Sequence, residues 1–167
     1  MKINTKVVII GIVIVLIVVA VIALVLMNNK SYSDEYSSSE LYNKVADSFS
    51  TEGGNNVLDE DVIFEFSEEE LPYLLDYTVI KAKNAKNINE VGIFKVEGGK
   101  AQEMKALVET YVANLQKSYR AMDYFPEEIE KIDCATVRVF GNYVIYSFLN
   151  ERDTESFYSE IENSIKK

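Results

Sequence analysis

The sequence contains no histidine and no tryptophan. Without histidine, Ser-His-Asp and Cys-His catalysis are excluded, and so are the usual zinc sites that need imidazole ligands. The lack of tryptophan weakens the case for a site that stacks on sugar rings. An enzyme built from this chain would have to work through carboxylates, lysine or tyrosine, and nothing in the sequence predicts a cofactor.

Cysteine is almost absent as well, because Cys134 is the only one. An internal disulfide is therefore impossible, which is unusual for a small eukaryotic secreted domain but ordinary for bacterial envelope proteins. With no histidine to serve as its base, Cys134 is expected to be a small buried residue rather than a nucleophile. It also lies more than a hundred residues after the apolar run near the N-terminus. A lipoprotein leader, which needs a cysteine at the end of that run, is not predicted.

Charge is missing from residues 7–27, a run of 21 residues without Asp, Glu, Lys or Arg. At about 1.5 Å per residue, such a helix spans the roughly 30 Å hydrocarbon core of a bilayer. Secretory leaders have a shorter apolar region followed by a small-x-small cleavage site. We therefore expect an uncleaved transmembrane signal anchor at 7–27. Lys2 and Lys6 precede it, so the positive-inside rule places residues 1–6 in the cytoplasm and the C-terminal domain outside the cell membrane.

Positive charge is scarce beyond the predicted anchor. Residues 28–167 contain 15 basic and 27 acidic residues, a formal charge of −12. This acidic balance argues against a nucleic-acid partner and against a domain that lies flat on an anionic membrane. The acidic stretches 59–61 and 68–70 lack the ligand spacing and central glycine of a calcium loop, so no metal site is predicted.

The patterning beyond the anchor predicts a flexible polar stalk at 28–39 and one extracytoplasmic domain at 40–167. Ser39 is expected to cap the first helix, and Pro126 to follow the end of the longest one. The expected helices are 40–49, a short one at 67–75, 100–122 and 153–166, and the expected strands are 77–84, 90–97 and a hairpin around Gly141-Asn142. The predicted fold is α+β, a mostly antiparallel sheet of about four strands with packed helices.

The hairpin has two faces whose roles differ. A turn at Gly141-Asn142 would pair Phe140 with Tyr143 and Val139 with Val144. One face would then carry the core residues Val137, Val139, Val144, Tyr146 and Phe148. The other carries four residues that form a candidate interaction surface, with a covering helix as the alternative: Arg138, Phe140, Tyr143 and Ile145.

Several short motifs occur together along the domain. Glu90 precedes Phe94 and Lys95 in a strand, Tyr124 and Pro126 follow the long helix, and Gly141 and Tyr143 form the hairpin. In this combination, residues 40–166 resemble a family of bacterial envelope proteins, the domain of unknown function four-three-five-eight. The resemblance implies a Gram-positive envelope protein, but no activity and no catalytic residue. This chain lacks the lipobox of the lipoprotein members, and its anchor replaces it.

Two functions from different classes remain open. The first is a non-enzymatic binding or accessory module of the cell envelope, whose partner is an envelope protein or a cell-wall ligand. The alternative is a carboxylate-based hydrolase acting on cell-wall polymers, for which two acids about 5–10 Å apart would be needed in a cleft. Glu90, Glu127 and Glu128 are the candidates for that role.

Overall fold

The computed structural model describes residues 31–49, 56–58, 71–82, 84, 86–122 and 126–167. The predicted anchor at 7–27 and the first four residues of the predicted short helix, 67–70, lie outside these ranges. None of the helices within them combines the length and apolar character needed to cross a membrane. The chain divides into two units, and the larger, Tyr32–Lys166, is the one described below.

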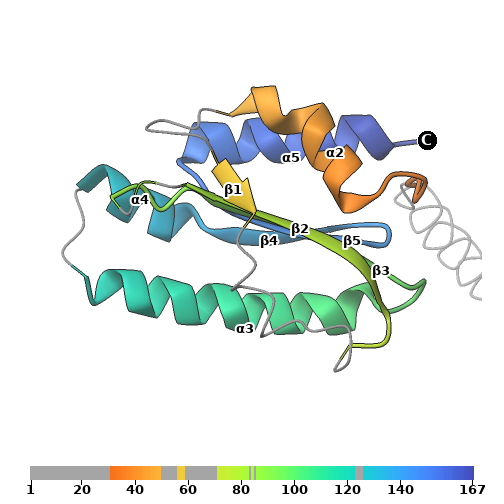
Figure 1. Cartoon of the computed structure of the whole chain (residues 1–167), viewed down its shortest axis with the longest axis horizontal. Coiled ribbons are helices and arrows are strands. Elements are labelled where there is room, and N and C mark those ends of the chain that lie inside the picture. The colour runs from red at the N-terminus through yellow and green to blue at the C-terminus, as the bar shows by residue number, and fades with distance from the viewer. Residues whose placement is uncertain (1–30, 50–55, 59–70, 83, 85, 123–125) are drawn as a thin grey trace, which may run out of the picture. The chain divides into compact units, whose positions relative to one another are not determined.

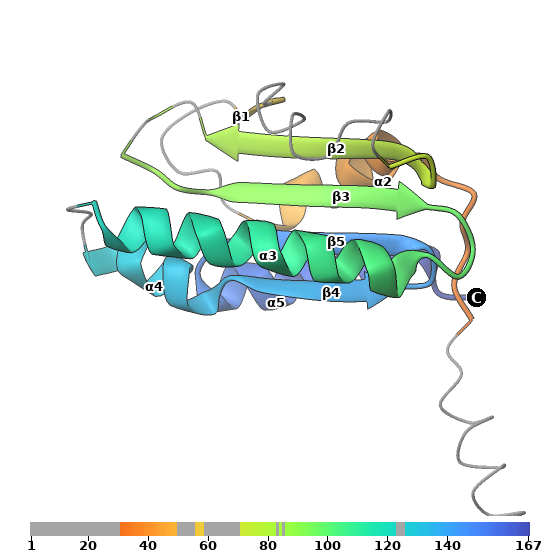
Figure 2. The same cartoon turned by 90° about the horizontal axis from the view of Figure 1, so that it is seen from below.

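The centre of the domain is an antiparallel sheet with the strand order β1-β2-β3-β5-β4 (Figures 1 and 2). Its strands are β1 (Asn56–Leu58), β2 (Leu74–Ala82), β3 (Glu90–Val96), β4 (Thr136–Phe140) and β5 (Tyr143–Phe148). The α+β prediction is confirmed, with four strands of five or more residues and the three-residue β1 beyond them. Strand β3 is central and has side chains buried on both faces.

Helices cover both faces of this sheet (Figure 1). They are α2 (Ser38–Val45), the 3₁₀ turn η1 (Ala46–Ser48), α3 (Ala101–Arg120), α4 (Pro126–Cys134) and α5 (Glu151–Ile165). Helix α3 runs along one face, whereas α2 and α5 lie side by side on the other. The chain therefore builds three layers, with the sheet in the middle.

Because side chains alternate along a strand, the sheet divides the apolar core into two clusters. The cluster under α3 contains Phe94, Val96, Met104, Val108, Tyr111, Tyr119, Val144, Tyr146 and Phe148. The cluster under α2 and α5 contains Leu41, Val45, Val91, Ile93, Phe140, Tyr143, Ile145, Phe157 and Ile161. The face of the hairpin that we predicted as core is confirmed, because Val144, Tyr146 and Phe148 are buried and Val137 and Val139 pack against them.

The hairpin register is also confirmed. Phe140 pairs with Tyr143 and Val139 with Val144. Gly141 has φ of 60°, the left-handed value that the first position of such a turn requires. The chain therefore reverses at the glycine that the sequence indicated.

Part of the predicted flexible stalk is instead packed on the domain. Tyr32 pairs with Lys166 and places its ring against Phe140, with 5.8 Å between the centroids. The carbonyl oxygen of Tyr36 accepts hydrogen bonds from Lys95 Nζ and Tyr143 Oη, at 2.9 and 2.6 Å. The stalk prediction is therefore wrong for these residues, because their aromatic and backbone groups find partners on the fold, which begins before residue 40.

Two element ends and one whole helix differ from the predictions. Ser37, not Ser39, caps α2, since its side chain pairs with the Glu40 backbone N–H while the Glu40 carboxylate accepts from the Ser37 N–H. The short helix predicted to run to residue 75 is wrong over its described part, because Leu74 instead begins β2, where it pairs with Val96 and is buried. Helix α4 was not predicted at all: Pro126 is its first residue, where a proline loses no hydrogen bond.

Candidate functional site

The hairpin face that we predicted as an interaction surface is covered. Phe140, Tyr143 and Ile145 are buried beneath α2 and α5, and Tyr143 and Ile145 have no exposed surface. Arg138 is partly exposed, but it pairs with Glu155 and lies over the Tyr158 ring, 4.3 Å from its centroid. The predicted surface therefore does not exist, because the α5 helix occupies it, which is the alternative that the sequence left open.

Among the three candidate carboxylates, Glu90 has the most distinctive surroundings. It begins β3 on the face under α3, and its side chain is fully buried. Its Oε1 accepts hydrogen bonds from Tyr146 Oη at 2.6 Å and Tyr111 Oη at 3.0 Å. Its Oε2 lies 3.6 Å from Lys81 Nζ and has no hydrogen-bond partner among the described residues. Two hydroxyl groups and one nearby ammonium group therefore offset the cost of burying this acid.

A glycine makes this arrangement possible. Gly92 faces Tyr146 across the β3–β5 pair. A Cβ atom on Gly92 would lie 2.1 Å from the Tyr146 ring, far inside contact distance. The missing side chain lets the ring lie across β3, where its hydroxyl group reaches Glu90, two residues away on the same face.

Both tyrosines are held in their neutral form. Burial, followed by the charge of Glu90, raises the pKa of Tyr146 and of Tyr111 well above the ordinary value. Each hydroxyl group therefore keeps its proton at physiological pH and donates it in a hydrogen bond to Glu90. The cluster fixes a carboxylate in place, and its tyrosines are poor acids.

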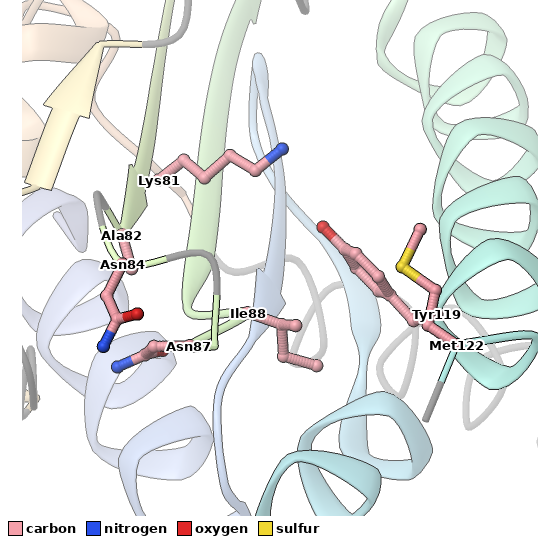
Figure 3. Close-up of a pocket in the computed structure, with 7 residues that line it drawn as sticks. All are labelled: Lys81, Ala82, Asn84, Asn87, Ile88, Tyr119 and Met122. Carbon is pink, nitrogen blue, oxygen red and sulfur yellow. The ribbon is translucent and has the colours of Figure 1, made fainter. Parts of the chain in front are cut away.

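Lys81 connects this buried cluster with a pocket (Figure 3). The pocket has a volume of about 250 Å³ and lies between the end of β2, the loop before β3 and the end of α3. Figure 3 shows the Lys81 ammonium group and the Tyr119 hydroxyl group pointing toward one another across it. Its walls are Lys81, Ala82, Asn84, Asn87, Ile88, Tyr119 and Met122. Among the residues that the structure describes, this lining combines a lysine and several neutral polar groups with aliphatic surface, and it contains no acidic side chain.

A second buried carboxylate holds the loop wall of the pocket. Glu128 Oε2 accepts a hydrogen bond from the Ile88 backbone N–H at 2.8 Å, and its Oε1 pairs with Lys131 Nζ at 2.7 Å. Lys131 Nζ also reaches the side-chain oxygen of Asn87, at 3.5 Å. Glu128 and Lys131 are both buried. Helix α4, which begins at Pro126, therefore fixes the position of Asn87 and Ile88.

The remaining candidates contribute little to this region. Glu127 is exposed on α4. Burial and nearby carboxylates raise the pKa of the Cys134 thiol, and a protonated thiol is a weak nucleophile. No group of three or more potential metal ligands occurs within the part of the chain that the structure describes.

Glu90 and Glu128 were candidates from the sequence, but four other residues of this region were not. Lys81 and Tyr119 line the pocket, and Tyr111 and Tyr146 bind Glu90 beside it. The available signal was an acidic residue at the start of an otherwise apolar strand, with a glycine two positions later. That pattern indicates a polar group facing the core beside a close approach of another residue. It does not indicate which residue approaches.

A family model matches part of the chain. Residues 73–149 match the family model described as "Domain of unknown function (DUF4358)". The resemblance seen in the sequence is confirmed over this stretch, which contains Lys81, Glu90, Tyr111, Tyr119 and Tyr146. No curated protein and no solved structure matches the chain.

Proposed function

We propose that this protein is a non-enzymatic binding or accessory module of the bacterial cell envelope. Residues 7–27 would anchor it in the cell membrane as a single span, with residues 1–6 in the cytoplasm and the folded domain outside. The uncharged run of 21 residues and the two lysines before it support the anchor and its orientation. The partner would be an envelope protein or a cell-wall ligand.

The single observation that favours binding over hydrolysis at the pocket beside Lys81 is the composition of its lining. A carboxylate-based glycosidase places two acids on either side of the scissile bond. The described residues that line the pocket include a lysine, two asparagines and a tyrosine but no acid. Glu90 lies behind Lys81 and its Oε1 accepts from two tyrosines, while Glu128 binds a backbone N–H group and Lys131. These carboxylates support the fold, which leaves the pocket suited to holding a ligand.

The proposed position of the domain is tested by labelling intact cells with a membrane-impermeant maleimide. Cys134→Ser removes the native thiol, and either Ser39→Cys or Asn4→Cys then adds a single new one. Ser39 is exposed at the start of α2. We expect Ser39→Cys to react in intact cells and Asn4→Cys to react only after permeabilisation. The reverse pattern would contradict the proposed orientation, and cleavage of the chain after the apolar run would contradict the anchor.

The binding role is tested by crosslinking the full-length protein in its native membrane, followed by mass spectrometry. We expect reproducible capture of one envelope or membrane protein, or of wall fragments. Incubation of purified full-length protein with cell-wall polymers provides the opposing test. Release of soluble fragments that Glu90→Gln abolishes would overturn the non-enzymatic proposal in favour of the hydrolase.

A further inference from the structure

We propose that the outer edge of strand β4 binds an extended, basic segment of a partner protein as an added strand of the sheet. The assignment rests on the binding role proposed above and gives that role a surface and a kind of partner. It depends on three features of β4 and its surroundings: backbone groups that point away from the sheet, the lack of a device that blocks pairing, and the carboxylates beside the strand.

Strand β4 lies at one edge of the sheet (Figure 2) and bonds to β5 through every second residue. The alternation follows from the Val96 N–H group, which donates to the Asn142 carbonyl oxygen at 3.0 Å and so directs Asn142 toward β3. Because successive residues of a strand direct their backbone groups to opposite sides, the next residue, Tyr143, directs its groups toward β4. From there, every second residue of β5 bonds to β4, and the β4 partners of these residues are Phe140, Arg138 and Thr136.

Val137 and Val139 lie between these residues, so their N–H and carbonyl groups point away from β5 in the plane of the sheet. Within the part of the chain that the structure describes, these backbone groups have no hydrogen-bond partner. Both residues are half-buried, and their side chains pack against the cluster under α3. The strand therefore presents two donors and two acceptors in a fixed row, which is the arrangement that an added strand requires.

The β4 edge lacks the features that usually prevent pairing at the edge of a sheet. Such edges are blocked by very short strands, by proline or lysine, or by a bulge. Strand β1, at the other edge, has only three residues. Strand β4 has five residues without proline or lysine, and it pairs with β5 without a shift in register. Its one charged side chain, Arg138, is paired with Glu155, so the edge stays open to a further strand.

Carboxylates of α5 follow β4, because this helix runs beside the strand (Figure 1). Glu155 lies beside Arg138, in the middle of β4. Burial, followed by the charges of Glu130 and Glu151, raises the pKa of the Cys134 thiol, so these two acids lie near the start of β4. Glu151 and Glu155 are one helical turn apart, about 6 Å along the axis. Alternate side chains of a strand are about 6.6 Å apart, so basic side chains at alternate positions of an added strand would face these acids.

The overall charge favours a basic partner over a second copy of this chain. Residues 28–167 carry a formal charge of −12, so two copies repel one another. A basic segment is attracted instead, and its charges also speed the encounter. Backbone hydrogen bonds along β4 would hold such a segment, and the acids beside the strand would select it.

The test measures amide hydrogen exchange by NMR in the full-length, ¹⁵N-labelled protein in micelles of a neutral detergent. The probe is an acetylated and amidated peptide in which lysine and valine alternate, and the same peptide with glutamate for lysine is the control. We expect the Val137 and Val139 amide protons to exchange rapidly in the free protein, because they lack partners, and those of Arg138 and Phe140 to exchange slowly. Saturating lysine peptide should slow exchange at Val137 and Val139 by at least about 10-fold. The glutamate peptide should bind at least about 10-fold more weakly, since its charges repel those of the domain.

Variants separate strand pairing from general attraction to an acidic domain. Val139→Pro removes an outward N–H group without removing a bond to β5, so the fold should persist, as circular dichroism can check. It should weaken binding of the lysine peptide by at least about 5-fold, because one donor is lost and the ring occupies the place of the incoming strand. Val139→Ile keeps the N–H group and a branched side chain, and it should bind within about 2-fold of the wild type. Should Val139→Pro fail to fold, Val137→Pro carries the same expectation, and the exchange measurement on the wild type depends on neither variant.

Three results would overturn the assignment: no saturable slowing at Val137 and Val139, equal binding of the lysine and glutamate peptides, or unchanged binding by Val139→Pro. Slow exchange at both valines that depends on protein concentration without peptide would show that a second copy occupies the edge, and it would also overturn the assignment. If the peptide does not bind at β4 but crosslinking captures an envelope partner, the β4 assignment fails and the proposed function stands. If the peptide binds as expected but the protein also releases fragments from cell-wall polymers, the β4 assignment stands and the non-enzymatic proposal fails.

Discussion

The two faces of the sheet are built from the same strands but differ in what they bury. Toward α2 and α5, strand β3 places Val91 and Ile93 in an apolar cluster. Toward α3, the same strand places Glu90 and Gly92 beside Phe94, and Tyr146 crosses over the glycine to bind the acid. A buried acid is costly unless it is fully partnered, so the α3 face depends on specific hydrogen bonds as well as on apolar packing. The α2–α5 face of the same strand depends on apolar packing.

The largest effect should come from opening a cavity on the apolar face. Phe157 is fully buried between α5 and the sheet, and the centroid of its ring lies 5.3 Å from the centroid of the Phe49 ring. Phe157→Ala should lower the free energy of unfolding by about 3–5 kcal/mol. Denaturant unfolding of the full-length protein in detergent, followed by circular dichroism, measures this change. Leu107→Ala, at an exposed position on α3, is the control and should stay within about 0.5 kcal/mol of the wild type.

The next largest effect should come from the hydrogen bonds to Glu90. Tyr146→Phe removes the 2.6 Å bond and keeps the ring. We expect the free energy of unfolding to fall by about 1.5–3 kcal/mol, which is the range for hydrogen bonds to a charged group. In a Glu90→Gln background the same change should cost only about 1 kcal/mol, because the acceptor is then neutral. A double-mutant cycle by denaturant unfolding measures the difference, and equal costs in both backgrounds would show that Glu90 is not the partner that matters.

Gly92 tests whether the close approach of Tyr146 is needed. Gly92→Ala places a methyl group where the Tyr146 ring lies, so the ring must move away from Glu90. We expect the free energy of unfolding to fall by about 1–3 kcal/mol, as it does when a well-packed core receives extra atoms. Gly98→Ala is the matched control, since nothing lies within 4 Å of its added Cβ atom. If the two variants unfold at the same denaturant concentration, Gly92 does not serve to admit the ring.

These faces also show what the sequence can predict. The hairpin followed from a local turn at Gly141-Asn142 and strict alternation, both of which act within a few residues. The Glu90 cluster could not be predicted, because it needs Tyr146, which is 56 residues away in the chain. An amphipathic face such as Phe140 and Ile145 has the same pattern whether a helix covers it or solvent does. Only the packing of α5 decides between the two.

Helix α4 was missed for a different reason. Proline disfavours a helical residue before it but is well suited to the first helical position after it, so Pro126 carried two opposite signals. The helix is short and exposes Ile129, while Ile132 is buried. Its hydrophobic pattern was therefore too weak to choose between the signals. Although α4 is short, it matters for the pocket, because its residues Glu128 and Lys131 hold the loop wall.

The smallest effect should come from Tyr143, a buried tyrosine on the α2–α5 face whose hydroxyl group pairs with a backbone carbonyl oxygen and not with an acid. Its hydroxyl group donates to the Tyr36 carbonyl oxygen, so Tyr143→Phe should cost about 0.5–1.5 kcal/mol at neutral pH. Burial, followed by the charges of Asp34 and Asp76, raises the pKa of Tyr143 to about 12. In the unfolded chain a tyrosine ionises near pH 10, so above that pH the unfolded state binds fewer protons than the folded state. Stability is therefore lost as the pH rises from about 10 to about 12.

Tyr143→Phe removes this contribution, whereas the other tyrosines contribute equally to both proteins and cancel in the difference. The cost of the substitution should be constant between about pH 7 and 9 and should shrink between about pH 10 and 12. Urea unfolding of both proteins across this range measures the difference directly. A cost that stays constant up to pH 12 would mean that Tyr143 ionises equally in both states. Solvent would then reach the Tyr143 hydroxyl group, and the core between the sheet and α2 and α5 would exclude water less well than the core under α3.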